Sequence, residues 1–156
     1  MKQIIFPAVL LLCISSCRLF EKKEQPDLVE EKIRMMDTDK AFSKMSEEKG
    51  IKTAFMEYLD SNGVLLRPNQ FPLVGADAVD YLVRQNDSNF VLKWEPKSGA
   101  IANSGELGYT YGIYALYAAD KDTTFYGNYV SIWKKQKDGS WKYVLDSGNE
   151  GVGEAE

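Results

Sequence analysis

The sequence FYGNYVSIWKKQKDGSWKYVLDS, residues 125–147, decides the fold class. It holds two runs rich in aromatic and β-branched residues, Phe125–Lys135 and Trp141–Ser147, on either side of a segment containing Asp138 and Gly139. An Asp-Gly pair between two such runs is a typical signal of a tight β-hairpin. The sequence therefore predicts two antiparallel strands close to the C-terminus.

The register of this hairpin follows from its turn, because a two-residue turn at Asp138-Gly139 fixes which residues face each other. Asp146 then faces Ser131 on the neighbouring strand. The adjacent pairs on the same face are Trp133–Val144 and Tyr129–Gly148. The opposite face is interpreted as core and carries Val130, Ile132, Trp141, Tyr143 and Leu145. The Asp146 face fits either a ligand cavity or an outer surface that packs on a second copy.

Working outward from the hairpin, the rest of the chain divides into helices first and strands afterwards. The expected helices lie between an Asp27 N-cap and a Gly50 stop, over Ile51–Tyr58, and from Ala76 to about Arg84. The expected strands are Val64–Arg67, Phe90–Trp94, Lys97–Ala102 and Leu107–Ala118. Helices followed by consecutive strands predict an α+β fold, in which an antiparallel sheet packs on about three N-terminal helices.

Three motifs give the chain a family resemblance. They are Val74-Gly75-Ala76-Asp77-Ala78, the strand start Gly105-Glu106-Leu107-Gly108-Tyr109-Thr110-Tyr111-Gly112, and the hairpin with Trp133-Lys134-Lys135 and Asp138-Gly139-Ser140-Trp141-Lys142. Together they resemble the SnoaL-like branch of the nuclear transport factor 2-like superfamily, which includes ketosteroid isomerase and polyketide cyclases. The resemblance implies a cone, in which a curved antiparallel sheet wraps around the helices and leaves an open-ended cavity.

The resemblance does not fix a function, because one fold hosts many activities. Members include isomerases, cyclases, dehydratases, binding subunits and inert scaffolds. Catalytic members commonly place a carboxylate base and Tyr or protonated carboxyl donors inside the cone. Scytalone-dehydratase-like members use histidine, and this chain has none.

The composition excludes several classes of chemistry. The chain has no histidine, and its two cysteines are Cys13 and Cys17. Ser-His-Asp and Cys-His catalysis and zinc sites built on His or Cys are therefore excluded. The net charge of −4 argues against nucleic acid as a partner. The sequence lacks a glycine-rich phosphate loop and a metal-ligand cluster, so we expect no metal and no cofactor.

The N-terminus resembles that of a bacterial lipoprotein. Lys2 precedes an apolar run, Ile4–Leu12, that is too short for a membrane span and is typical of a signal peptide. The small residues of Ile14-Ser15-Ser16 before Cys17 resemble a lipobox, in which the cysteine thiol is diacylated and the chain is cut just before it. The alternatives are a plain secretory signal or a membrane helix.

These features predict four segments and a location. The segments are a signal peptide at 1–16, the lipidated Cys17 and a tether at 17–27, the SnoaL-like cone domain at 28–149, and a frayed tail at 150–156. The predicted location is the bacterial cell envelope, with the protein anchored to the membrane through Cys17.

Two acids are the candidate catalytic residues. Asp39 falls within or beside the apolar stripe of the first helix, where burial raises the pKa of a carboxyl group. It could act as a base or polarising acid in the cavity, or as a structural acid paired with Arg67, Arg84 or a backbone amide. Asp146 lies on the last strand, where it would face either the cavity or a second copy.

Eight further residues are candidates for binding a ligand, because they are aromatic or could contact an acidic group. Arg67 could bind such a group at the mouth of the cone, and an ion pair with Asp39 or Asp60 is the simpler alternative. The tyrosines could donate hydrogen bonds to an oxyanion, or simply be good strand formers. The eight are Phe55, Tyr58, Arg67, Trp94, Tyr109, Tyr111, Tyr129 and Trp133.

Three functions stay open from the sequence. The first is an envelope lipoprotein whose cone binds a small, largely apolar or carbonyl-bearing molecule without catalysis. The second is a cofactor-independent isomerase, cyclase or dehydratase that uses Asp and Tyr side chains. The third is an interaction module that forms a homodimer through a sheet face or docks on another component of the envelope. The lack of histidine, and of two acids that clearly converge, favours binding over catalysis.

Overall fold

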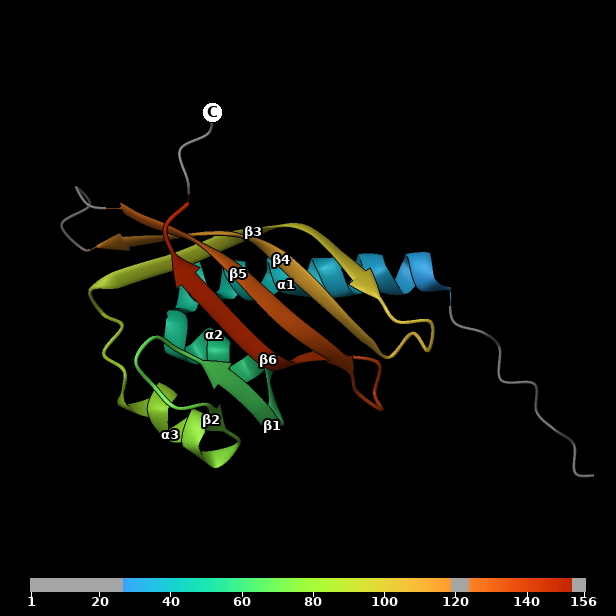
Figure 1. The fold of residues 1–156 in the computed structure, drawn as a ribbon, viewed down its shortest axis with the longest axis horizontal. Coiled ribbons are helices and arrows are strands. Elements are labelled where there is room, and N and C mark those ends of the chain that lie inside the picture. Colours follow the sequence, from blue (N-terminus) through green and yellow to red (C-terminus); the bar gives the residue numbers. More distant parts are fainter. Residues whose placement is uncertain (1–26, 119–123, 153–156) are drawn as a thin grey trace, which may run out of the picture.

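Three helices and six strands make up the described part of the computed structural model, residues 27–118 and 124–152. In chain order they are α1 Leu28–Lys49, α2 Ile51–Tyr58, β1 Leu59–Leu66, β2 Leu73–Val74, α3 Ala76–Arg84, β3 Phe90–Ile101, β4 Leu107–Ala118, β5 Thr124–Lys135 and β6 Trp141–Glu150. Figure 1 shows the long helix α1 lying across one face of the sheet formed by β3, β4, β5 and β6.

The ends of α1 are set by the two residues that the sequence predicted. The side chain of Asp27 accepts hydrogen bonds from the backbone N–H groups of Val29 and Glu30, at 2.9 and 3.2 Å. Such a cap satisfies donors that have no partner within the helix. Gly50 follows the last turn with a φ of 91°, a conformation that glycine adopts without strain.

The sheet has the strand order β2-β1-β6-β5-β4-β3. Strands β3 to β6 are antiparallel neighbours, as predicted, but β1 pairs with β6 in parallel. The expectation of an entirely antiparallel sheet was therefore wrong at this one pairing. Parallel neighbours need a long crossover connection, and here nearly the whole second half of the domain connects β1 to β6.

Three predicted boundaries also differ from the structure. The expected strand Val64–Arg67 is β1, which begins earlier, at Leu59, and ends at Leu66. The expected strands Phe90–Trp94 and Lys97–Ala102 form one strand, β3, with an irregularity between Pro96 and Ser98. Proline has no N–H to donate, and an edge strand with a bulge accommodates it. At the C-terminus, β6 continues to Glu150, one residue into the predicted tail.

A bulge in the C-terminal hairpin changes which residues face inward. Ser131 pairs with Asp146 as predicted, but Trp133 pairs with Tyr143 and not with Val144. The extra residue shifts the alternation of β6 by one position. Trp133, Trp141 and Tyr143 are consequently all buried on the same side of the sheet.

This shift corrects the predicted core face. Among the residues assigned to it, Trp141 and Tyr143 are buried, whereas on β5 Val130 is exposed and Ile132 is only half-buried. The face of β5 that carries Tyr129, Ser131 and Trp133 is the inner one, and these three side chains are at most 9% exposed.

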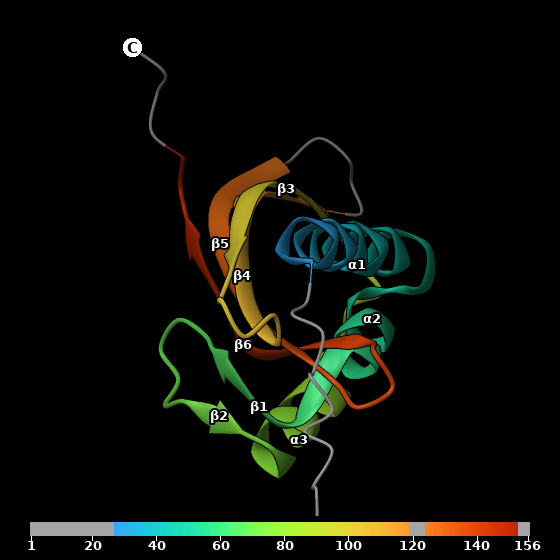
Figure 2. The same ribbon diagram turned by 90° about the vertical axis from the view of Figure 1, so that its right-hand side faces the viewer.

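The inner face of the sheet curves around α1, as Figure 2 shows for β3, β4 and β5. Phe42 of α1 lies at the centre of this contact. Its ring stacks on Tyr143 with 5.5 Å between centroids and meets the edges of Trp94 and Phe55 at 4.5 and 4.8 Å. Such aromatic contacts add to the hydrophobic free energy of burying the rings.

Glycines on the inner face make room for large side chains. A Cβ on Gly112 would lie 2.8 Å from Cε1 of Tyr129, and a Cβ on Gly127 would lie 2.4 Å from Cζ of Tyr114. Both tyrosine rings therefore lie close against the backbone of a neighbouring strand, because no side chain intervenes.

The predicted signal peptide, Cys17 and the tether up to residue 26 lie outside the described residues, as does the end of the predicted tail. Within the described ranges, 27–118 and 124–152, no helix combines the length and the apolar character that crossing a membrane requires.

The contact between Tyr143 and α2 yields a stability prediction. The Tyr143 hydroxyl donates a buried hydrogen bond to the carbonyl oxygen of Phe55, at 2.9 Å. We expect Tyr143→Phe to lower the free energy of unfolding by about 0.5–1.5 kcal/mol, because the carbonyl loses one of its two donors and keeps the backbone N–H of Leu59. Urea denaturation measures this, with Tyr111→Phe on the exposed face as the control. Equal stability of the two variants would contradict the role of this bond.

Candidate ligand-binding site

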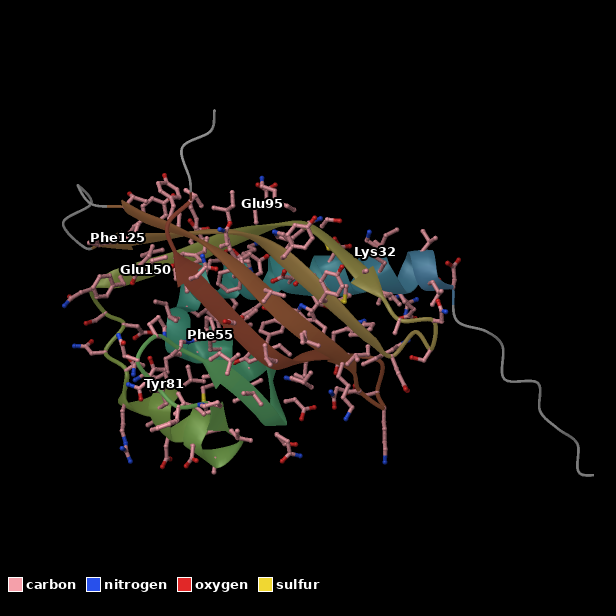
Figure 3. The ribbon with its side chains drawn as sticks, in the orientation of Figure 1. Lys32, Phe55, Tyr81, Glu95, Phe125 and Glu150 are labelled. Atoms are coloured by element: carbon pink, nitrogen blue, oxygen red, sulfur yellow. The ribbon has the colours of Figure 1, made fainter. Side chains whose placement is uncertain are left out.

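A cavity of about 360 Å³ lies between α2, α3 and the inner face of the sheet. Its walls are mostly apolar. Ile51, Leu82 and Leu116 contribute aliphatic surface. The aromatic side chains that line it are Phe55, Tyr81, Phe90, Trp94, Tyr114 and Tyr129. Figure 3 labels Phe55 near α2 and Tyr81 near α3, the two helices that border the cavity.

Asp39 lies behind this cavity and not in it. The residue has no exposed surface. Its Oδ1 accepts a hydrogen bond from Nε1 of Trp94 at 2.7 Å, and its Oδ2 accepts one from the hydroxyl of Tyr129 at 2.8 Å. Trp94 and Tyr129 thus form the wall that separates the Asp39 carboxyl group from the cavity. The predicted pairing of Asp39 with Arg67, Arg84 or a backbone amide is replaced by these two side chains.

The pKa of Asp39 is raised, and burial is the main cause. Hydrogen bonds from Trp94, Thr110 and Tyr129 act in the opposite direction, and the charge of Asp146 raises the pKa further. Thr110 can donate to Asp39 because its oxygen already accepts a hydrogen bond from Nε1 of Trp133, at 2.8 Å. Burial therefore disfavours the charged form of Asp39, and the hydrogen-bond donors stabilise that form in part.

Tyr129 is held as a hydrogen-bond donor to Asp39. Burial raises the pKa of its phenol far above the ordinary value, followed by the charge and hydrogen bond of Asp39. The proton of Tyr129 stays on the ring oxygen and points to Asp39. In this arrangement it is not directed at a ligand, which an oxyanion donor would require.

Asp146 lines the cavity, and both its oxygens are occupied. Oδ1 accepts a hydrogen bond from Nη2 of Arg67 at 2.7 Å, and Oδ2 accepts one from the hydroxyl of Ser131 at 2.8 Å. Arg67 also donates from Nη1 to the carbonyl oxygens of Leu66 and Asp146. Its guanidinium lies 5.4 Å from the centre of the Phe55 ring. The predicted ion pair of Arg67 with Asp39 or Asp60 is thus formed with Asp146 instead.

The structure places the predicted binding residues in three different surroundings. Phe55, Arg67, Trp94 and Tyr129 line the cavity together with Asp146. Trp133 is fully buried in the core, and Tyr58 packs against that core. Tyr109 and Tyr111 lie on the outer face of β4.

Tyr109 and Tyr111 do not belong to the site. They are 45% and 47% exposed, and their rings stack on each other at 6.5 Å. The alternation along β4 directs Thr110 inward against α1 and the two tyrosines outward. Exposed apolar side chains of β4 and β5 surround them, namely Leu107, Ile113 and Val130. A homodimer through this sheet face stays a prediction.

Sequence reasoning missed several residues of the cavity wall. Tyr114 lies on the same strand as Tyr109 and Tyr111 but on its inner face, opposite Gly127 on β5. That glycine directly across from a tyrosine is the signal that could have identified it. Tyr81 on α3 and Phe90 at the start of β3 gave no comparable signal in the sequence. Their positions in the cavity wall depend on how α3 packs against the sheet.

Neither acid is placed to remove a proton from a molecule in the cavity. Asp39, whose pKa is raised, lies behind Trp94 and Tyr129. Asp146 reaches the cavity but is held by Arg67 and Ser131. A general base must lie within hydrogen-bond reach of the proton that it removes. Within residues 27–118 and 124–152, no three His, Cys, Asp or Glu side chains gather in a way that could hold a metal ion.

Comparison with known proteins identifies the fold but no close relative. No protein-family model matches the sequence, and no curated protein matches it. A ketosteroid isomerase-like protein from Erwinia carotovora atroseptica is similar in structure, with a TM-score of 0.62, 13% identity, and coverage of 78% of this chain and 96% of the other.

Two further solved structures agree with this result. A nuclear transport factor 2-like protein from Salmonella enterica has a TM-score of 0.59 and 14% identity, over 82% of this chain and 99% of the other. A protein of the same superfamily from Novosphingobium aromaticivorans has a TM-score of 0.61 and 9% identity, over 77% and 81%. Likeness at such identities shows the fold alone, and the predicted cone is confirmed.

The buried Asp39 yields a prediction about pH. Its pKa in the folded chain is raised above the unfolded value of about 3.9, so the folded chain keeps this proton to higher pH. The corresponding stability is complete below about pH 4 and is lost as the pH rises through the folded-state pKa. We expect the stability of the wild type to fall relative to Asp39→Asn over this interval.

Urea denaturation between about pH 4 and pH 8 measures this difference. Asp37→Asn is the matched control, since Asp37 lies on the exposed side of α1, paired with Lys40. It should show no comparable change. A wild-type advantage that grows with pH would mean that the three hydrogen-bond donors outweigh burial.

Proposed function

We propose that this chain, which has the nuclear transport factor 2-like fold, binds a small and largely apolar molecule in the cavity beside α2 and α3. The observation that carries the proposal is the cavity itself. Its volume of about 360 Å³ lies within the range of about 300–1,000 Å³ typical of small-molecule sites. Walls of aromatic and aliphatic side chains with a smaller number of polar groups are also typical of such sites.

The polar groups at the edge of the cavity would orient the bound molecule. Arg67 and Asp146 form an ion pair beside the Phe55 ring, and both are more than four-fifths buried at their side chains. Arg67 makes three hydrogen bonds through its two terminal nitrogens, so further N–H groups are available for a carbonyl or hydroxyl group. A molecule with an apolar body and one polar end fits this arrangement.

Binding is favoured over catalysis by the positions of the two acids. An isomerase or cyclase of the ketosteroid isomerase type would need a carboxylate with access to the substrate and a donor aimed at its oxygen. Here Tyr129 donates to Asp39, and Asp146 is held by Arg67 and Ser131. Proton transfer would require these hydrogen bonds to rearrange first.

Filling the cavity tests the proposal directly. Leu116 lines the cavity, whereas Ile113 on the same strand is exposed on the outer face. We expect Leu116→Trp to reduce the amount of small molecule retained on purification from the host envelope by about tenfold, because the indole occupies the binding volume. Native mass spectrometry measures the retained mass.

The matched control is Ile113→Trp, which adds the same side chain on the outer face of β4. It should retain the ligand as the wild type does. Retention of the same molecule by both variants would place the ligand elsewhere and contradict the proposed site.

We also propose that the domain is held at a membrane through lipid on Cys17. The support is the sequence Ile14-Ser15-Ser16-Cys17 after a short apolar run. Attachment through two or more acyl chains is stable, whereas a single chain gives only marginal binding. A ligand of low solubility in water would then be bound close to the bilayer.

Replacement of this cysteine tests the anchor. We expect Cys17→Ser to move the protein from the membrane fraction to the soluble fraction, because the serine hydroxyl does not accept the lipid. Fractionation of cells that express each form measures this. Cys13→Ser, four residues earlier, is the control and should leave the distribution unchanged. Full membrane retention of Cys17→Ser would contradict the lipoprotein proposal.

A further inference from the structure

The charges around the cavity are not balanced. Arg67 is the one positively charged residue among the described residues that line it, and its charge is matched by Asp146, with 2.7 Å between Nη2 and Oδ1. Three of its N–H groups already donate to Asp146 and to the carbonyl oxygen of Leu66. The cation at the edge of the cavity is therefore already neutralised within the protein.

Two further carboxylates line the cavity, at Asp87 and Glu150. Asp87 accepts a hydrogen bond from the backbone N–H of Lys52 at 2.7 Å, so part of its charge is directed at the first turn of α2. Glu150 is exposed at the end of β6 and has no such contact to a helix. After the Arg67–Asp146 pair is set aside, the charge that remains at the cavity is negative.

Glu150 lies close to the aromatic wall. Gly127 on β5 pairs with Tyr114 on one side and with Glu150 on the other. Burial raises the pKa of Tyr114, the negative charge of Glu150 raises it further, and the positive charge of Arg67 lowers it. Tyr114 and Glu150 both line the cavity, so the carboxylate lies beside the space that a ligand would occupy. In Figure 3, Glu150 lies on the same side of the molecule as Phe55 and Tyr81, and Lys32 lies at the other end.

We propose that the ligand carries a basic group, so that the cavity takes an apolar organic amine in preference to the corresponding acid. The inference rests on the proposed function, and it specifies the chemical class of the ligand. Glu150 would attract the ammonium group toward the mouth of the cavity. Tyr114, Tyr129 and Trp94 also line the cavity, and an aromatic ring attracts a cation that lies over its face.

The same features act against an acidic ligand. A carboxylate in the cavity would meet Glu150 and Asp87, both of its own sign, and the only lining cation in the described residues is already paired. The chain as a whole also has a net charge of −4, which disfavours the approach of an anion. An apolar alcohol is uncharged, so these carboxylates would neither attract nor repel it. Its affinity should lie between that of the amine and that of the acid.

Three probes of one carbon skeleton test the proposal: phenylbutylamine, phenylbutanol and phenylbutanoate. Titration calorimetry of the full-length chain at neutral pH measures their affinities. We expect the amine to bind at least about fivefold more tightly than the acid, with the alcohol between them. We expect added salt to narrow the difference, because it screens the exposed charge of Glu150.

Two charge-neutralising variants separate a local effect from net charge. Glu150→Gln should reduce the preference for the amine to about twofold or less, because the attracting carboxylate is removed. Glu106→Gln removes the same charge from the turn between β3 and β4, beside the end of β5 that is distant from Glu150. That variant should keep the preference of the wild type.

The outcomes distinguish the proposal from the function on which it rests. Binding of the acid as tightly as the amine, with loss of both in Leu116→Trp, would overturn the charge preference and keep the cavity as the site. If Glu150→Gln and Glu106→Gln reduced the preference for the amine equally, the proposal would also be overturned. The preference would then come from the net charge of the chain and not from Glu150. Failure of all three probes to bind would overturn the binding function itself.

Discussion

The carboxyl group of Asp39 has no contact with solvent, and such a group is stable inside a protein only where donors reach it. Three strands supply them, through Trp94 on β3, Thr110 on β4 and Tyr129 on β5. These hydrogen bonds hold α1 at one depth against the curved sheet. The cavity begins on the other side of Trp94 and Tyr129, so the side chains that satisfy the buried acid are also the wall that a ligand contacts. A change in the packing of the core around Asp39 would therefore also change the shape of the cavity.

Local patterns were sufficient to predict most of the elements and the pairing of Ser131 with Asp146. The alternation of each run predicts the strands within a few residues of sequence. The predicted two-residue turn was wrong, because the N–H of Gln136 donates to the carbonyl oxygen of Ser140 and the loop between them holds residues 137–139. The bulge in β6 offsets this difference and restores the predicted pairing of Ser131 with Asp146. The bulge at Val144 escaped prediction, because one extra residue leaves the composition of both strands unchanged. Its effect is visible only in the structure, where Trp141 and Tyr143 are buried beside Trp133. The parallel pairing of β1 with β6 was missed for a related reason, since it joins segments that are distant in sequence.

The site was predictable in part. The position of Asp39 in the apolar stripe of the first helix indicated a buried acid, but its partners Trp94 and Tyr129 lie 55 and 90 residues away. No local spacing links such distant residues. The outward direction of Tyr109 and Tyr111 depends on which face of β4 the helix covers. Gly108 lies on the covered face, where a Cβ would come within 2.6 Å of Sδ of Met35 on α1. A glycine at this position is the local sign of that close approach.

The glycines of the inner face have a consequence for how such sites are compared. Tyr129 and Tyr114 lie close to Gly112 and Gly127, which carry a hydrogen atom where other residues carry a methyl or more. A Cβ at either position would meet the ring and also a backbone carbonyl oxygen of the next strand, that of Glu95 or Asn149, so a side chain there would change the shape of this wall. Two proteins with identical wall residues would then accept molecules of different size. The largest ligand that fits thus depends on Gly112 and Gly127. Neither glycine lines the cavity, so a comparison of lining residues alone would miss this effect.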